Sequence, residues 1–463
     1  MELKKYKLGE ILDVTRGASL SGEFYAAEGE YVRLTCGNFD YQNNCFKENK
    51  AKDNLYYIGD FKPDFLMKEG DIITPLTEQA IGLLGSTAII PESGKYIQSQ
   101  DVAKIVCKEH LLDKDFAFYL ISSNLVKQQL SAAAQQTKIR HTSPDKIKDC
   151  IVWIPELEEQ KRIGKLLRTI DLKIELNRQL NHNLEAMAKQ LYDYWFVQFD
   201  FPDENGKPYK SSGGKIVWDK RLKREIPLLW KAKIVEEVAD VYNGATPSTV
   251  NELNYGGDIV WITPKDLSDQ KQKFVYQGER NISQVGYDSC STHLLPSNTI
   301  LMSSRAPIGL LAIAKTELCT NQGFKSFVSK SKNIATYLYY YLQYHITQIE
   351  QLGTGTTFKE VSREDILKFP MLKPSDNVLD LWEEIVSALN DRQLEIQKEN
   401  ENLIKQRDEL LPLLMNGQVS VNYDLAETGF ILFCISIATK ICFQLIKSII
   451  VNSVLIIAFY INP

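Results

Sequence analysis

Two segments of the chain carry an apolar residue at every seventh position, with charged or amide side chains at most of the others. In residues 156–199 one step of this repeat is polar, Asn177, whereas the repeat that follows Pro374 is apolar throughout. A seven-residue repeat is typical of long helices that pair as a coiled coil. The residues that we expect to pair the helices are Ile163, Ile170, Asn177, Leu184 and Leu191 in the first segment and Trp382, Leu389, Ile396, Leu403 and Leu410 in the second, each 219 positions beyond its counterpart.

Each predicted helix begins next to a proline, Pro155 or Pro374, a residue that a helix tolerates in its first turn. A helix of about 40 residues spans roughly 60 Å. A buried Asn177 would favour one register of the pair at some cost in stability. The alternative is that each helix is amphipathic and packs only on its own domain. We favour the pair, because two heptad runs of this length usually associate.

A second pattern is a long internal repeat. The sequence DVTRGAS at Asp13–Ser19 matches DVYNGAT at Asp240–Thr246, and the letters IGLL occur at Ile81 and again at Ile308, with an offset of 227 residues in both cases. Further pairs follow in the same order: YVRLT with IVWIT, QSQDVAKI with TNQGFKSF, and TSPDKI with VSREDI. Solenoid units are far shorter than this period. The chain is therefore predicted to alternate a module and a connector, twice.

Each module is predicted to be mixed α/β. Short runs rich in β-forming residues are separated by Gly, Asn, Asp and Pro, and a helical segment follows them. We interpret IGLL as the start of one apolar strand that is used in both modules. In the first module the expected strands are Tyr31–Thr35, Asp71–Thr74, Ile81–Ile90 and Ala103–Val106, and the expected helices are Asp115–Leu130 there and Ile334–Leu352 in the second module.

Composition places the chain among globular proteins of two or three domains, with 463 residues, 44% hydrophobic residues and a net charge of −5. Nucleic-acid binding is still possible at this charge, because a binding face needs only local basic residues. Eight scattered cysteines without a CxxC pair indicate reduced thiols. The first residues lack the apolar core of a signal peptide. We therefore expect a cytoplasmic location.

The sequence offers no catalytic, cofactor-binding or metal site. It contains no phosphate-binding GxxxxGK[ST] loop, no GxGxxG after a strand, no HExxH pair and no [DNS]PP[FYW] tetrapeptide of amino-methyltransferases. Paired acids near the predicted helix starts, such as Glu158–Glu159, are better explained by the helix dipole than by catalysis.

Both modules instead contain polar loops rich in hydrogen-bond donors, at matching places in the repeat. Arg and Lys pair with guanine edges and phosphates, Gln and Asn pair with adenine, and Ser and Thr contact either. Any one of these loops, taken alone, could be an ordinary polar loop. The candidate DNA-binding residues are Thr35, Asn38, Gln79, Gln98, Gln100, Lys138 and Arg140 in the first module, and Thr263, Lys265, Ser303, Ser304, Arg305, Asn321, Gln322, Lys325, Thr356 and Lys359 in the second.

The connectors carry a resemblance to a known family. The segment Ile154–Phe201 closely resembles the central conserved helix of specificity subunits of type I restriction–modification enzymes, and Arg407–Val421 resembles the end of their second conserved helix. PIGLLAIA and NQGF are similar to landmarks of their target recognition domains. The resemblance covers residues 1–425 or so.

The resemblance implies a non-catalytic subunit for bacterial defence that recognises double-stranded DNA. Two mixed α/β target recognition domains, related by a pseudo-two-fold repeat and separated by two long antiparallel coiled-coil helices, would each read one half of a split sequence. The helices would dock two modification subunits, which bind S-adenosylmethionine and methylate adenine. Where restriction subunits are present, two copies would add ATP- and Mg²⁺-dependent motor and nuclease activity.

The expected organisation follows from the repeat and the resemblance. It comprises target recognition domain 1 at 1–155, the central conserved helix at 156–200, a linker at 201–232, target recognition domain 2 at 233–374, the second conserved helix at 375–421 and an atypical hydrophobic tail at 422–463.

The tail has two interpretations. Residues 429–463 are apolar and rich in isoleucine, but their longest charge-free run, Ser448–Pro463, has 16 residues. A membrane-spanning helix needs about 20. The tail is either a membrane anchor or the product of out-of-frame or extended translation of an A/T-rich gene. We favour the latter, because a DNA-reading protein gains nothing from a bilayer, and expect the tail to be dispensable for DNA recognition.

Two other functions compete with the specificity subunit. One is a self-contained DNA methyltransferase or nuclease with its own specificity domain, against which the missing cofactor motifs argue. The other is a membrane-tethered coiled-coil scaffold, which the tail and the heptads suggest but which leaves the duplicated modules unexplained.

Overall fold

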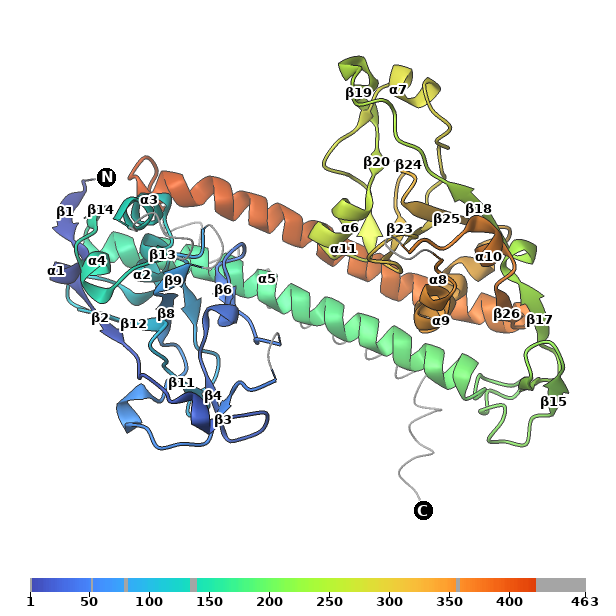
Figure 1. The fold of residues 1–463 in the computed structure, drawn as a ribbon, viewed down its shortest axis with the longest axis horizontal. Coiled ribbons are helices and arrows are strands. Elements are labelled where there is room, and N and C mark those ends of the chain that lie inside the picture. The colour runs from blue at the N-terminus through green and yellow to red at the C-terminus, as the bar shows by residue number, and fades with distance from the viewer. Residues whose placement is uncertain (1, 51–52, 79–81, 134–139, 355–358, 422–463) are drawn as a thin grey trace. The chain divides into compact units, whose positions relative to one another are not determined.

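The computed structural model describes residues 2–50, 53–78, 82–133, 140–354 and 359–421 (Figure 1). Within them the chain forms two compact units: unit 1 holds residues up to 177 together with 399–421, and unit 2 holds residues 178–398. Each unit thus combines one predicted module with part of both long helices. The hydrophobic tail, residues 422–463, lies outside the described residues.

Unit 1 is built around an antiparallel sheet with the strand order β10-β8-β12-β2. A smaller sheet, β11-β4-β7-β3, includes one parallel pair, β11 with β4. The elements of this module are β1 (Lys4–Lys7), α1 (Leu8–Ile11), β2 (Leu12–Arg16), β3 (Tyr25–Ala26), β4 (Tyr31–Arg33), β5 (Phe39–Asp40), β6 (Cys45–Phe46), β7 (Tyr56–Tyr57), β8 (Ile72–Pro75), β9 (Thr77–Glu78), β10 (Ala88–Ile89), β11 (Tyr96–Ile97), β12 (Val102–Cys107), α2 (Lys114–Ile121), α3 (Asn124–Ala133), β13 (Arg140–His141), α4 (Pro144–Lys148) and β14 (Ile151–Ile154).

Unit 2 has a sheet of five strands in the order β18-β25-β22-β23-β21. Strand β21 joins its edge parallel to β23, whereas the other pairs are antiparallel. The elements are β15 (Ile216–Asp219), β16 (Arg224–Pro227), β17 (Lys231–Ile234), β18 (Ala239–Asn243), β19 (Tyr255–Ile259), β20 (Trp261–Ile262), α6 (Pro264–Gln270), β21 (Phe274–Val275), α7 (Gln284–Asp288), β22 (Ile300–Ser303), β23 (Leu311–Ala314), β24 (Cys319–Thr320), β25 (Phe324–Ser329), α8 (Ala335–Tyr344), α9 (Ile346–Gln351), α10 (Arg363–Leu367) and β26 (Pro370–Lys373).

The two modules share one fold. Strands β2, β12, β8 and β10 of unit 1 follow each other in the sheet as β18, β25, β22 and β23 do in unit 2. The repeated glycines sit in equivalent places: a Cβ on Gly17 would stand 2.3 Å from the carbonyl oxygen of Gln98, and one on Gly244 would stand 2.1 Å from that of Asn321. No side chain fits at such a distance, so the repeat keeps glycine there. The predicted duplicated mixed α/β module is confirmed.

Within the described residues IGLL forms a turn, and the strand begins only at the last residue of the motif or later. Among the described residues of the first copy, the chain turns at Gly82 and Gly85, and only Ala88–Ile89 pair as β10. In the second copy Ile308 and Gly309 form a turn before β23 begins at Leu311. Gly82 and Gly309 have φ angles of 96° and 90°, in a region that favours glycine. The motif recurs because both modules need the same tight turn before this strand.

The long helices are α5 (Leu157–Tyr192), followed by a π-helical turn (Asp193–Val197), and α11 (Asp376–Met415). Both begin two residues after their proline. In each unit the two helices lie alongside one another (Figure 1), with contacts such as Asp171 to Arg407 in unit 1 and Asn181 to Gln393 in unit 2. As the residue number increases along α5, the number of the contacting residue on α11 decreases, so the two helices are antiparallel.

The heptad residues lie on the packed side of the helices. Ile163, Ile170, Leu184, Trp382, Leu389, Ile396 and Leu403 are buried, and Leu191 and Leu410 are partly buried against the same clusters. Asn177 is 3% exposed, and its Nδ2 donates to Glu399 Oε2 at 2.7 Å and to Asn400 Oδ1 at 3.0 Å. The polar step in the repeat is thus buried and hydrogen-bonded, as buried polar groups must be.

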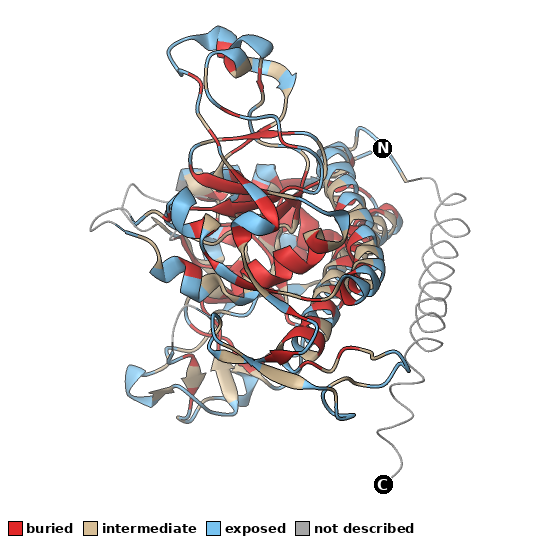
Figure 2. Ribbon diagram, turned by 90° about the vertical axis from the view of Figure 1, so that its right-hand side faces the viewer, coloured by how far each residue is buried: buried red, intermediate tan, exposed pale blue. Residues whose placement is uncertain are grey.

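Aromatic side chains form the centre of unit 2, where buried residues gather on the sheet and the adjoining helices (Figure 2). Trp382 of α11 is fully buried, with ring centroids 4.9 Å from Phe196, 5.7 Å from Tyr340 and 5.9 Å from Tyr192. The seventh-position tryptophan therefore packs the helices onto the second module as well as onto each other.

A buried charge also ties the second module to its helices. The Nζ of Lys273, just before β21, lies 2.7 Å from Glu185 Oε2 on α5, 2.6 Å from the Tyr340 hydroxyl on α8 and 2.7 Å from Asn390 Oδ1 on α11. Burial lowers the pKa of Lys273 to about 8, and Glu185 opposes this shift. We call these residues, together with Gln393, the Lys273 cluster.

Candidate nucleic-acid interface

Four candidate residues of the second module lie together at one end of strand β22: Ser303, Ser304, Arg305 and Lys325. Ser303 and Ser304 are fully buried. The hydroxyl of Ser303 donates to the carbonyl of Pro307 at 2.6 Å and accepts from the amide of Leu310 at 2.8 Å, while the amide of Ser304 donates to Gly323 at 2.7 Å. These serines shape the loop, and the next residue, Arg305, is left exposed on it.

Arg305 is held by a carboxylate on a neighbouring segment. Its Nε donates to Glu360 Oε2 at 3.0 Å, and the other oxygen of Glu360 lies 3.3 Å from the Nζ of Lys325. Burial lowers the pKa of Lys325, and Glu360 counteracts that shift. One carboxylate thus serves two cations, of which Arg305 is half exposed and Lys325 is buried. Arg305 is the cation that a ligand could reach.

The first module has an arginine–glutamate pair between the corresponding two segments, shifted by one residue. Its carboxylate, Glu78, lies three residues after β8, whereas Arg305 lies two residues after β22, and the arginine, Arg140, comes from β13. Arg140 Nη1 lies 3.5 Å from Glu78 Oε2, and Glu78 Oε1 accepts from the amide of Gly82 at 2.8 Å. An arginine–glutamate pair therefore joins equivalent segments in both modules, with the arginine on opposite strands.

A second pair of loops follows strands β11 and β24. Gln98 is buried and its Nε2 donates to the carbonyls of Thr15 at 2.7 Å and Val102 at 3.1 Å. Gln100 and Gln322 are exposed at equivalent positions of the repeat, two residues before β12 and β25. Gln322 accepts a short hydrogen bond from the hydroxyl of Thr246. The repeat thus places an exposed glutamine at the same position in both modules.

The threonines of the third pair of loops cap short helices. Thr35 accepts from the amide of Gly37 at 3.2 Å, and its own amide donates to the buried Asn38. Thr263 forms the corresponding box with Asp266 at the start of α6. These side chains satisfy the free amides of a helix start. The adjacent Lys265 remains exposed and pairs with Glu279 at 2.8 Å.

The structure thus sorts the predicted DNA-binding residues by accessibility, and base contact stays a prediction for all of them. Exposed are Gln100, Lys265, Arg305, Gln322 and Lys359; half-buried are Arg140, Thr263 and Asn321; buried are Thr35, Asn38, Gln98, Ser303, Ser304 and Lys325; and Gln79, Lys138 and Thr356 lie outside the described residues. The buried ones use their polar atoms within the module, so a direct role falls on the exposed and half-buried ones.

Three residues of this interface were not among the sequence candidates. Glu78 and Glu360 hold the arginines, and Thr246 bonds Gln322. Glu360 directly follows the candidate Lys359 in the sequence, whereas Glu78 has no arginine or lysine next to it, so its pairing with Arg140 is visible only in the fold.

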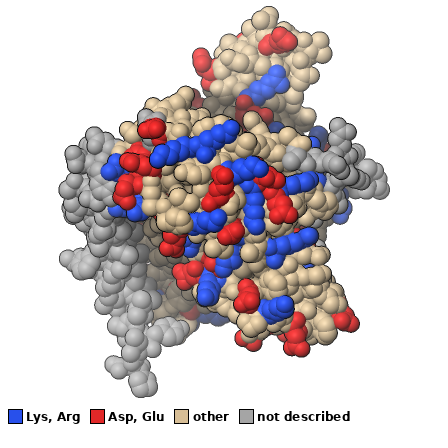
Figure 3. All heavy atoms as spheres, turned by 90° about the vertical axis from the view of Figure 1, so that its left-hand side faces the viewer, with Lys and Arg blue, Asp and Glu red and all other residues tan. Residues whose placement is uncertain are grey.

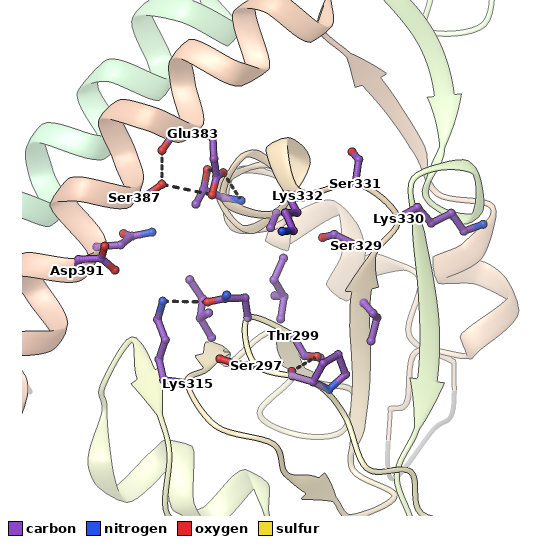
Figure 4. A pocket seen from close by; sticks show the side chains of 18 residues that line it. Ser297, Thr299, Lys315, Ser329, Lys330, Ser331, Lys332, Glu383, Ser387 and Asp391 are labelled. Atoms are coloured by element: carbon purple, nitrogen blue, oxygen red, sulfur yellow. Dashed lines mark hydrogen bonds between the residues drawn. The ribbon is translucent and has the colours of Figure 1, made fainter.

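A cavity of about 580 Å³ opens at the other end of the same sheet, between β22, β25 and helix α11 (Figure 4). Lys315, Lys332, Ser329 and Asp391 surround it, and Lys315 donates to Asn298 at 3.0 Å. In unit 1 the position equivalent to Glu383, which lines this cavity, is Gly164, where a Cβ would meet the amide of Phe116 at 2.7 Å. None of the candidate DNA-binding residues lines the cavity.

Charge is mixed on the one face that Figure 3 shows. On the face shown in Figure 3, lysine and arginine lie among aspartate and glutamate, without a broad field of one sign. Among the described residues, no group of three or more His, Cys, Asp or Glu side chains is placed to hold a metal ion. No helix in the described part of the chain is both long and apolar enough to cross a bilayer.

The chain thus contains two copies of one α/β module, each packed on the antiparallel helices, with Arg140 on β13 of the first and Arg305 on the loop after β22 of the second, as in a protein with two similar recognition modules. The family model described as "Type I restriction modification DNA specificity domain" matches residues 1–186 and 227–406. The chain belongs to this family of type I restriction–modification specificity proteins.

Individual relatives agree with the family. The specificity subunit of the MjaIX enzyme of Methanocaldococcus jannaschii is 35% identical over 197 residues, which are 41% of this chain and 46% of that protein. The HindI specificity subunit of Haemophilus influenzae is 25% identical over 467 residues, which are 90% of this chain and 99% of that protein. The crystal structure of an S subunit from M. genitalium covers 89% of this chain and 96% of its own, with 15% identity and a TM-score of 0.58, and shows the same fold.

These findings confirm the predicted family and fold class: two mixed α/β domains with long helices between them. The prediction of a specificity subunit, in place of a self-contained methyltransferase or nuclease, is also confirmed.

Proposed function

We propose that this chain determines the DNA sequence specificity of a type I restriction–modification complex. It would recognise a split sequence, with one half-site read by each module. The repeated arginine–glutamate pair supports this most directly. Both modules use the same fold to hold an accessible arginine, yet they place it on opposite strands. Two modules that share one fold but offer different contacts are suited to two different half-sites. Because both readers are in one chain, the target need not be palindromic.

The glutamates suit a mechanism in which each arginine exchanges a carboxylate partner for DNA. In the free protein each arginine is paired with glutamate, at 3.5 Å for Arg140 and 3.0 Å for Arg305. A guanine edge offers two acceptors to one guanidinium, and phosphates offer further ones. DNA would therefore take over an arginine that the carboxylate has already oriented.

We expect Arg305→Ala to weaken binding of the recognised sequence by about 1–3 kcal/mol, because one base contact in the second half-site is lost. Methylation of that sequence should fall, and specificity should relax in the second half-site only. Arg140→Ala should do the same for the first half-site only. The measurement is methylation mapping of DNA from cells that express the chain with its modification subunit, together with binding to duplexes altered in one half-site.

Lys330→Ala and Lys7→Ala are matched controls for this experiment. Both lysines are exposed and ion-paired, to Asp240 and Asp149, and neither lies on the candidate loops. They should leave the recognised sequence unchanged. If Arg305→Ala weakened all DNA equally and relaxed no position, the arginine would contact phosphate and not a base. If neither arginine variant altered binding or methylation, these loops would not be the interface.

The helices are proposed to carry the modification subunits, which would supply S-adenosylmethionine, while restriction subunits would supply the ATP- and Mg²⁺-dependent steps. Support comes from apolar residues on the outer side of α5 in unit 1: Leu172 and Leu176 lie one helical turn apart and are 48% and 61% exposed. Neighbouring apolar side chains left in water mark interaction sites.

We expect Leu176→Asp to lower the affinity for the modification subunit at least tenfold, because it would bury a charge in the contact. Co-purification and analytical ultracentrifugation of the full chain with that subunit measure this. Glu175→Asp, at the adjacent position, is the control and should bind normally. Unchanged assembly of Leu176→Asp would remove this face from the proposed docking surface.

A further inference from the structure

The polar contacts by which each module packs on the long helices differ in kind between the units. In unit 2 the segment Gln272–Phe274 runs along α11: Gln397 Nε2 donates to Gln272 Oε1 and to the carbonyl of Phe274, both at 2.9 Å. Between these two bonds lies Lys273, with its ammonium bonded to both helices and to α8. The contact is a continuous polar strip along one helix.

Unit 1 uses other chemistry at the equivalent place. Asp171 of α5 accepts from the hydroxyl of Tyr119 at 2.5 Å and from Arg407 Nη1 of α11 at 2.9 Å. Tyr119 of α2 corresponds to Tyr340 of α8 in the repeat, and Asp171 lies 219 residues before Asn390. A tyrosine of the module therefore meets the same helix position in both units, but the cation comes from the helix in unit 1 and from the module in unit 2.

The helix sequences follow this difference. Positions 390, 393 and 397 of α11 are Asn, Gln and Gln, whereas the equivalent positions 171, 174 and 178 of α5 are Asp, Ile and Arg. Glu185 corresponds to Ile404. In unit 1, Ile174 and Ile404 belong to an apolar cluster with Ile170 and Leu403.

The part of the second module that meets this strip is itself additional. Strand β21, which follows Lys273, is the fifth strand of the sheet in unit 2, and the described sheet of unit 1 has four strands without it. The amide strip on α11 and the extra strand thus occur together.

We propose that these contacts are a docking code, which assigns each recognition module to its own part of the helix pair. A module without Lys273, placed on the strip, would leave Asn390 Oδ1 and Gln397 Nε2 without their partners from the module. It would also remove the nearest cation of Glu185. Unpaired buried polar groups are costly. The second module placed at the other position would face Ile404, Asp171 and Ile174, so its ammonium would lose most of its acceptors. The code goes beyond DNA recognition, because it concerns assembly of the chain itself.

Module exchange tests the code. In a full-length chimera, residues 233–374 are replaced by a second copy of residues 1–155. A recoded version also carries Glu185→Ile, Ala188→Arg, Asn390→Asp, Gln393→Ile and Gln397→Arg, which are the residues of the equivalent positions in the other helix. Limited proteolysis and hydrogen exchange measure docking of the second module.

We expect the chimera with native helices to be cleaved at least tenfold faster than the natural chain, and the recoded helices to restore most of its resistance. The same five changes in the natural chain should raise the rate of cleavage in its second module at least tenfold, while the first module stays protected. Equal resistance of two folded chimeras, or full protection of the natural module on recoded helices, would overturn the code.

The natural chain with recoded helices tests the docking code even if both chimeras fail to fold. No DNA enters these measurements, so loss of the proposed DNA function and loss of the docking code are separate results.

Discussion

Replacing Lys273 by methionine is expected to lower the free energy of unfolding of unit 2 by about 3–5 kcal/mol, the range for breaking a buried ion pair by removing one partner. The methionine removes the ammonium that satisfies Glu185, Tyr340 and Asn390. The Glu185 carboxylate would then lose its nearest cation, and Lys189 would remain 3.7 Å from its Oε1. Tryptophan fluorescence during urea unfolding reports on this, because five of the six tryptophans lie within residues 178–398.

Two further variants show whether the loss arises from the unpaired carboxylate. Removing both charges, in Lys273→Met with Glu185→Leu, should recover most of the stability, because an apolar pair of similar size often replaces a buried ion pair at little cost. Lys265→Met is the control for a lysine in an exposed ion pair and should change stability by less than about 1 kcal/mol. A stability of Lys273→Met within that limit would show that the cluster does not stabilise unit 2.

The stability contributed by Lys273 should also depend on pH in a defined direction. Its pKa is about 8 in the folded chain and 10.5 for an ordinary lysine. Between these values the unfolded chain binds more protons than the folded one, so the contribution grows as pH rises and is lost as pH falls through the folded pKa. The difference in stability between the natural chain and Lys273→Met should therefore widen from pH 8 to pH 10.

Trp382→Ala is expected to cost about 3–5 kcal/mol in unit 2, the range for deleting a buried aromatic side chain. Trp382 is fully buried between Phe196, Tyr340 and Tyr192, so the truncation leaves a cavity that these surrounding rings can fill only in part. Thermal unfolding followed by circular dichroism measures the loss.

Trp218→Ala is the matched control for this prediction. Trp218 lies on the β15–β16 hairpin and is 63% exposed. Its removal should change stability by no more than about 0.5 kcal/mol. Similar losses for the two tryptophans would mean that the heptad position does not anchor the helix to the module.

The helix pair could be predicted from the sequence because its determinant is a one-dimensional pattern. The seven-residue spacing places Ile163, Ile170 and Leu184 on one face of the helix whatever that face contacts. The same holds for the modules, since similar segments in the same order must fold in the same way. The predicted helix starts at Pro155 and Pro374 each missed the observed start by two residues.

Two local predictions failed for reasons of backbone geometry. The apolar letters of IGLL predict a strand, but the glycine within the motif adopts a positive φ in both copies. The helix expected over Asp115–Leu130 is split at Ser122–Ser123, whose hydroxyls bond the carbonyls of the preceding turn. Hydrophobicity alone distinguishes neither a turn from a strand nor one helix from two.

The sequence by itself determined that this chain holds two copies of one α/β module and two long helices, and that it resembles a family of DNA specificity subunits. Only the tertiary structure decided that Ser303 and Gln98 are buried while Arg305 and Gln322 are accessible, and that Lys273 ties the second module to both helices. Periodic patterns act between neighbours in the chain, whereas these contacts join residues such as Lys273 and Asn390, 117 positions apart. Their formation depends on how the folded elements pack, which no local pattern specifies.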